Sequence, residues 1–238
     1  MTTSEFKEEF NLRYNNALEG APGLDTFEIS SYLTIAQEQY VKINYDVTKD
    51  ATSSFEQKEK SRRILNELVN NEKISSATSS SRGLVNESKF YELSNEAMYI
   101  VLETAVVNGE VIEVIPVTHD EFMVSYKNPF RKPNKRKAWR MDISKENSKT
   151  TVEIISSETI SSYNVRYLSY PSPIIIGDLQ TSEDVAGLGL TINGKTAVAT
   201  SILTDPTHRD IINIAVENAV LDYRESSLQA RMQLDSRV

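Results

Sequence analysis

The sequence contains no cysteine among its 238 residues. Disulfide bonds, thiolate metal sites and cysteine nucleophiles are therefore excluded, and the absence fits a chain that folds in a reducing compartment. No apolar run approaches the roughly 18 to 20 residues that a membrane helix needs. The first residues also lack the apolar core of a signal peptide. We therefore expect a soluble intracellular product with no membrane partner.

Motifs of catalysis and cofactor binding are also missing. The glycine-rich segment 187–194 lacks the Gly-Lys-Ser/Thr ending of a phosphate-binding loop, and no nucleophile elbow, zinc-protease pair or kinase signature occurs. His119 is followed by Asp120 and Glu121, but acidic residues in a first helical turn also complement the helix dipole. We expect His208 to be a surface residue in a first turn. The sequence thus predicts no enzyme, no metal and no cofactor, with an unrecognised site around His119 as an alternative.

The N-terminal part, residues 1–73, is predicted to be helical. Phe6, Phe10 and Tyr14 recur at helical spacing. Asp25 followed by Glu28 indicates a capping box at the start of a second helix, and Ser53 with Glu56 indicates another. A polar loop or linker is expected over 74–97, which includes the serine-rich run 75–82.

The middle of the chain, residues 98–203, is predicted to form an antiparallel β insertion. Two apolar segments flank Asn108-Gly109, the strongest local indicator of a hairpin. Further strands are expected at 137–143, 152–156, 163–170 and 196–203. A closing helix follows at 204–224, where Asp205-Pro206 provides its start, and a polar tail at 225–238 ends the chain. The fold class is therefore α+β, with a bundle-like helical frame around an inserted β region.

One segment, KNPFRKPNKRKAWR at 127–140, concentrates positive charge. It carries seven Lys or Arg residues and no acid, and since the chain has a net charge of −8, the other residues carry −15. A solvated charge run is one interpretation. Contact with nucleic acid is another. It would make the chain a nucleic-acid-binding accessory protein that uses Lys127, Arg131, Lys132, Lys135, Arg136, Lys137 and Arg140.

A protein–protein contact is the interpretation that we favour for this segment. The isoelectric point near 5.0 argues against a free-standing nucleic-acid-binding domain. Aromatic side chains offer apolar anchors, and two prolines lower the cost of ordering the loop. The predicted interface residues are Lys127, Phe130, Arg131, Lys132, Lys135, Arg136, Lys137, Trp139 and Arg140.

Four stretches together resemble a known family. They are FNLRYNNALEGAPGLDTFEISSYLTIAQEQYV at 10–41, PVTHDEF at 116–122, NPFRKPNKRKAWRMD at 128–142 and LTDPTHRDIINIAVENAVLDYRES at 203–226. In combination they are similar to structural ring proteins of the head–tail connector (portal adaptor) in crAss-like tailed bacteriophages. The resemblance spans nearly the full chain.

The resemblance implies a structural role. It implies a connector ring beneath the portal, with no catalysis and with twelve copies around a channel that genomic DNA passes without sequence-specific binding. Its partners would be further copies, the portal protein and adjacent tail ring proteins, in a virion made in the host bacterial cytoplasm. In such adaptors a C-terminal extension docks into the portal. The corresponding residues here are Leu228, Arg231, Met232, Leu234 and Arg237.

Overall fold

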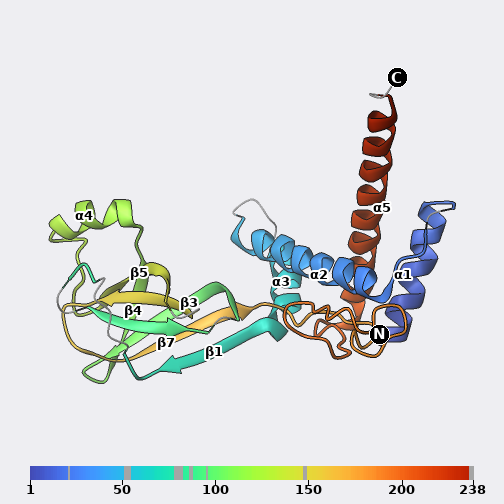
Figure 1. Ribbon diagram of the computed structural model, residues 1–238. Coiled ribbons are helices and arrows are strands. Elements are labelled where there is room, and N and C mark those ends of the chain that lie inside the picture. The colour runs from blue at the N-terminus through green and yellow to red at the C-terminus, as the bar shows by residue number, and fades with distance from the viewer. Residues whose placement is uncertain are drawn as a thin grey trace. The chain divides into compact units, whose positions relative to one another are not determined.

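The protein is described by a computed structural model, which covers residues 1–20, 22–50, 55–77, 83–85, 88–94, 96–146 and 149–235. The chain divides into two compact units (Figure 1). Unit 1 combines Met1–Leu68 with Pro171–Val238, and unit 2 is Val69–Tyr170. Residues 78–82 of the serine-rich run lie outside the described residues. Ser53 of the second expected capping box also lies outside them.

Unit 1 is built from helices. They are α1 (Thr3–Ala17), α2 (Thr26–Lys49), α3 (Phe55–Leu65), the short 3-10 helix η1 (Asn66–Leu68) and α5 (Asp205–Asp235). The capping box expected at Asp25 and Glu28 is confirmed, and Thr2 with Glu5 forms a second one at the start of α1. In the described part of the chain, no helix is long and apolar enough to cross a membrane.

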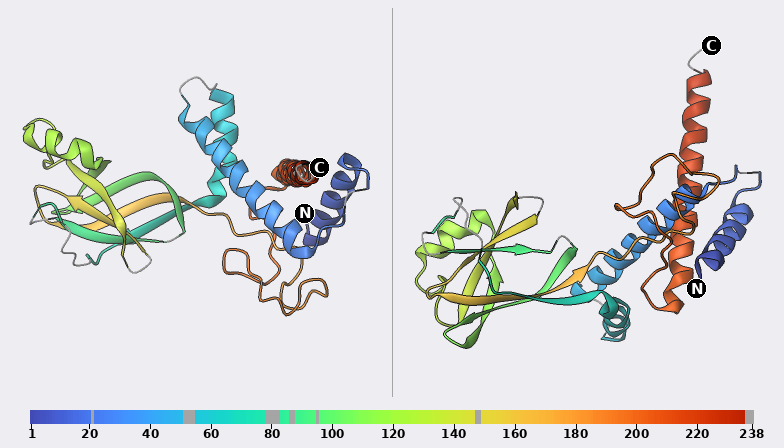
Figure 2. Two further views of the ribbon diagram at one scale, coloured as in Figure 1. Left: turned by 45° about the horizontal axis from the view of Figure 1, so that its top comes forward. Right: turned by 60° about the horizontal axis from the view of Figure 1, so that its bottom comes forward.

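The core of unit 1 lies between three of these helices. Viewed along its axis, α5 lies between α1 and α2 (Figure 2, left). Phe6, Phe10 and Tyr14 form the buried face of α1, and the spacing of four residues places them on one side of the helix. On α5, Ile211 and Ile212 are fully buried.

Residues 171–204 belong to unit 1 and form no named strand, so the strand expected at 196–203 is wrong. Ala199 makes only an isolated bridge to Ile175. Instead, three buried polar side chains of α2 bind the backbone of this segment. Ser30 accepts from the amide of Ile176, Thr34 accepts from the amide of Ile174, and Gln37 donates to a carbonyl at residue 172. These side chains replace the partner strand that would otherwise satisfy the backbone.

Unit 2 is a curled seven-stranded sheet with one helix. Its strand order is β1-β7-β3-β4-β5-β6-β2. The elements are β1 (Val69–Ile74), β2 (Lys89–Leu93), β3 (Ala97–Val107), β4 (Glu110–Pro116), α4 (His119–Lys127), β5 (Lys137–Glu146), β6 (Lys149–Ile155) and β7 (Ile160–Ser169). Strands β1 and β2 therefore lie in segments for which the sequence predicts helix and loop.

The α+β class is confirmed, but the sheet is mixed. Strands β4 and β5 run parallel, whereas the other pairs are antiparallel. Parallel neighbours need a long crossover connection, and α4 with the basic loop supplies it. The hairpin at Asn108-Gly109 is confirmed: both residues have positive φ, and Val107 pairs with Glu110.

Side chains that point into the curl of the sheet form the main core of unit 2. Tyr91, Ala105, Val152 and Tyr163 are among its buried members, and they come from four different strands. A second, smaller cluster lies between α4 and β5. This second cluster fixes the position of the basic loop.

Candidate assembly surface

Helix α4 is held against β5 by aromatic packing. Its N-cap is Thr118, whose side chain accepts from the amide of Glu121. Phe122 and Tyr126 lie one turn apart and face Trp139, with ring centroids 6.1 and 6.5 Å from it. Edge-on aromatic contacts at this distance are favourable. The inner face of α4 is thereby fixed, and the other side of the helix is turned to solvent.

Apolar side chains lie on this outer side. Met123 is 57% exposed, Val124 is 70% exposed, and Phe130 in the following loop is 89% exposed. Large apolar side chains that gather on an exposed surface mark sites of protein interaction. Met123 and Val124 are absent from the predicted interface. The helical spacing could have indicated them, because Phe122 and Tyr126 occupy the inner face of α4.

The basic loop has a defined conformation. Asn128 accepts the amide of Phe130 on its side chain, and its carbonyl accepts the amides of Arg131 and Lys132. Asn134 accepts the amide of Arg136 in the same way and forms a bridge to the start of β5. Asparagine side chains that bind the backbone two residues ahead stabilise turns. These hydrogen bonds therefore hold the backbone of the loop in one conformation.

The cations of the segment fall into two groups. The side chain of Lys137 donates to the carbonyl of Phe130, and Lys135 lies 3.7 Å from Glu158. Arg140 pairs with Glu103 inside unit 2. The other four cations are exposed and join the apolar residues in what we call the α4–loop surface. It comprises Met123, Val124, Lys127, Phe130, Arg131, Lys132 and Arg136.

Trp139 and Arg140 do not belong to this exposed surface. Trp139 is 3% exposed and packs with Phe122 and Met141. Because side chains alternate along a strand, Trp139 and Met141 face α4, and Ala138 and Arg140 face the opposite side. The sequence pattern places Trp139 and Arg140 in the charged loop together with the exposed cations. Strand β5 begins at Lys137, however, so both residues belong to the strand and their side chains are largely buried in unit 2.

Arg140 forms a nearly buried ion pair inside unit 2. Its guanidinium lies 2.8 Å from Glu103 and 3.5 Å from Asp142, and the Arg140 and Glu103 side chains are 11% and 5% exposed. Burial raises the pKa of Glu103 despite the nearby Arg140. Burial and the Glu103 charge also raise the pKa of Tyr163. Arg140 is therefore unavailable for a phosphate backbone.

The histidines have structural surroundings. His119 begins α4, and its Nε2 lies 3.0 Å from the carbonyl of Asp142. In the described residues no group of three or more His, Asp or Glu side chains is arranged to hold a metal. The expectation of a surface position for His208 is wrong. It is buried beside Phe6, and its Nε2 lies 2.8 Å from the carbonyl of Leu203.

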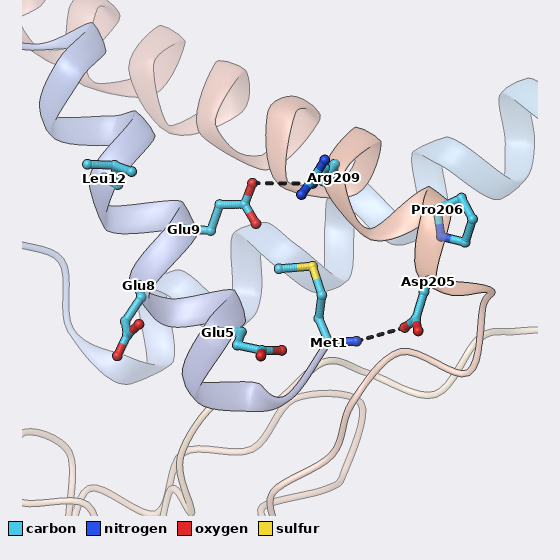
Figure 3. A pocket seen from close by; sticks show the side chains of 8 residues that line it. All are labelled: Met1, Glu5, Glu8, Glu9, Leu12, Asp205, Pro206 and Arg209. Atoms are coloured by element: carbon cyan, nitrogen blue, oxygen red, sulfur yellow. Dashed lines mark hydrogen bonds and ion pairs between the residues drawn. The ribbon is translucent and has the colours of Figure 1, made fainter.

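Unit 1 carries a pocket of about 940 Å³ between α1 and the start of α5 (Figure 3). Met1 contacts α5 there, because its amine lies 2.7 Å from Asp205. We call this the acidic pocket, since four of its lining residues are carboxylates. These are Glu5, Glu8, Glu9 and Asp205, and their cationic neighbours in the lining are the Met1 amine and Arg209.

The C-terminal segment continues α5. The sequence predicts the helix to end near residue 224, but α5 reaches Asp235 and extends past α1 and α2 (Figure 1). The backbone of Leu228, Arg231, Met232 and Leu234 is therefore helical, and Arg237 lies outside the described residues. The apolar residues are carried on a helix rather than an irregular tail.

Comparison with known proteins identifies the family. Residues 1–231 match the family described as phage tail ring protein 3/4. The chain belongs to this family. It is 32% identical over 231 residues to Ring protein 3 of Bacteroides phage crAss001, covering 93% of this chain and 96% of that protein. It is also 30% identical over 242 residues to Ring protein 4/5 of the same phage, covering 100% and 99%.

The resemblance to ring proteins of crAss-like phages is thus confirmed. A tail ring protein is a structural component of the phage particle, and it works in an oligomeric assembly with other ring proteins. Membership in the phage tail ring protein 3/4 family favours a structural role over catalysis. Family membership also bears on the α4–loop surface, because a ring subunit needs surfaces that contact its neighbours.

Proposed function

We propose that this phage tail ring protein forms a ring of the head–tail connector beneath the portal. The ring contains twelve copies, surrounds a channel for the genome and joins the portal to the tail. The observation that carries the proposal is the α4–loop surface, where exposed apolar side chains accompany cations on a fixed scaffold. Such a surface suits a protein partner, and membership of a ring family supplies the kind of partner.

Contacts with the portal are assigned to the end of α5. Leu228, Met232 and Leu234 are apolar positions on a helix that continues to Asp235, and Arg231 and Arg237 accompany them. A helix that extends past α1 and α2 offers a preformed element for docking into a groove. Genomic DNA passes the ring without sequence-specific binding, because dense fixed phosphate contacts would hinder its sliding.

The cations of the basic segment are assigned to subunit contacts rather than to nucleic acid. Of the seven, Arg140 is held by Glu103, and Lys137 and Lys135 have partners inside unit 2. Exposed charges also contribute little to folding. Charge reversal at the exposed Arg131, Lys132 and Arg136 is expected to weaken ring assembly more than the stability of the monomer.

Electron microscopy of the purified chain, alone and mixed with its portal, tests the proposal. We expect twelve-fold rings, at least on the portal template. Deletion of residues 225–238 should abolish portal docking and leave the circular dichroism of the remainder intact. Finding only monomers under every condition, with no portal binding, would refute the connector function. Docking that survives the deletion would move the portal contact elsewhere on the chain.

A further inference from the structure

A ring of identical subunits needs two different surfaces on each chain. Head-to-tail contacts are heterologous, so the surface presented to one neighbour must complement another surface presented to the next. The α4–loop surface, which includes the 89% exposed Phe130, lies in unit 2 and is one candidate. Its complement should accept an aromatic side chain and carry negative charge.

We propose that the α4–loop surface of one copy docks into the acidic pocket of a second copy. This inference rests on the proposed ring and names the two surfaces that close it. Phe130 enters the pocket beside Leu12, and Arg131 and Lys132 lie against Glu5 and Glu8. The contact is heterologous and therefore propagates from copy to copy.

The apolar parts of the two surfaces match. Leu12 is 62% exposed in the wall of the acidic pocket, where Met1 and Pro206 also offer apolar atoms. The volume of about 940 Å³ lies within the roughly 300–1,000 Å³ of pockets that enclose small ligands. It therefore has room for the ring of Phe130, which is 89% exposed, whereas the ring of Trp139 is 3% exposed.

The charges also match. Four carboxylates against the Met1 amine and Arg209 give the pocket a net negative charge, and the α4–loop surface contributes four exposed cations. Glu9 is held by Arg13 and Glu5 by its capping box, but among the described residues Glu8 forms no ion pair. Complementary potentials favour encounter and suppress incorrect partners.

The loop is prepared for binding. The turns at Asn128 and Asn134 and the bond from Lys137 to the Phe130 carbonyl fix its backbone before contact. Less conformational freedom is then lost on association. Neither surface requires a segment outside the described residues.

Site-specific cross-linking tests this contact, since the chain has no cysteine of its own. Leu12→Cys and Phe130→Cys are made in separate full-length chains, which are mixed at high concentration and treated with a short bis-maleimide. We expect a covalent dimer that contains one chain of each kind. Val111→Cys, at an exposed position of β4, replaces Phe130→Cys in the matched control and should give little dimer.

Charge exchange provides a second measurement. Glu8→Lys and Arg131→Glu are each expected to lower the yield of the Leu12–Phe130 cross-link and of oligomers by about tenfold, because like charges then meet. A mixture of the two variants should recover assembly, since copies that alternate between the two variants make only native or fully exchanged contacts. Glu217→Lys and Lys42→Glu, at other exposed positions, serve as controls.

Each result has a definite meaning. The selective cross-link with recovery in the mixture supports the contact between copies. Recovery only when both exchanges are in one chain indicates docking of the loop within its own chain and overturns the inference. Absence of the cross-link, both free and on the portal, also overturns it, whereas rings observed in the same samples would leave the connector function standing.

Discussion

The backbone amide of Ile174 donates to Oγ1 of Thr34 at 3.1 Å, although 140 positions separate the two residues. Both are buried, and the contact is part of the polar strip along α2 that holds residues 172–176. The Thr34 side chain accepts the backbone hydrogen bond that a neighbouring strand would accept in a sheet. This pairing explains how a run of three isoleucines is buried without a sheet.

Replacement of Thr34 by valine should destabilise unit 1. Valine preserves the shape but leaves the Ile174 amide buried without an acceptor, which costs about 1–3 kcal/mol. Urea unfolding followed by circular dichroism measures the free energy of unfolding. Thr34→Ser retains the hydroxyl and is the matched control. Equal stability of the valine and serine variants would contradict the importance of this bond.

Trp139 and Phe130 should have opposite mutational effects. Trp139→Ala removes the centre of the cluster between α4 and β5 and should destabilise unit 2 by about 3–5 kcal/mol. Phe130→Ala removes an exposed side chain, so its effect on the free energy of unfolding should stay within about 0.5 kcal/mol. We expect Phe130→Ala to reduce oligomer formation instead. Thermal unfolding and sedimentation velocity separate the two effects, and strong destabilisation by Phe130→Ala would refute this assignment.

The ion pair of Glu103 and Arg140 should depend on both partners. Loss of one leaves the other charge buried, and for buried pairs this costs about 3–5 kcal/mol, an upper bound here because Asp142 is nearby. Glu103→Leu and Arg140→Met should therefore each destabilise unit 2. The double variant Glu103→Leu/Arg140→Met should recover much of the loss. Additive losses in the double variant would show that the two side chains act independently.

His208 should make unit 1 sensitive to mild acid. Burial lowers the pKa of His208 below its ordinary value of 6.5, and its neighbours are the Met1 amine, Asp205, Glu67 and the Leu203 carbonyl. The folded chain thus binds fewer protons than the unfolded chain in the window between the lowered pKa and 6.5. The free energy of unfolding should keep the whole contribution of neutral His208 above pH 6.5. It should decrease as the pH falls from 6.5 to the lowered pKa of His208. His208→Gln should flatten this dependence in denaturation at several pH values, and an unchanged slope would contradict it.

Local patterns in the sequence predicted much of the fold. Asp25 and Glu28 located the start of α2, Asn108-Gly109 located the hairpin of β3 and β4, and the alternating segments located β5 to β7. These features depend on neighbours a few positions away. The parallel pairing of β4 with β5 was missed, because it depends on α4 packing through Phe122 onto Trp139.

The candidate surface was predicted in part. Charge alone identified the basic segment, but charge does not reveal that β5 starts at Lys137 and turns Trp139 and Arg140 inward. The acidic pocket was not foreseen, since its walls come from α1 and α5, which lie at opposite ends of the sequence. Residues that meet only through the tertiary fold leave no local pattern.

The chain enters and leaves unit 2 through neighbouring strands, with Val69 paired to Leu168. An insertion whose two ends are adjacent can be replaced as a unit, because a short connection is enough to join the two chain ends that remain in unit 1. The helices of unit 1 can thus be retained in related ring proteins while the inserted unit is varied. One helical frame that accepts different insertions provides a route to ring proteins that are related but not identical.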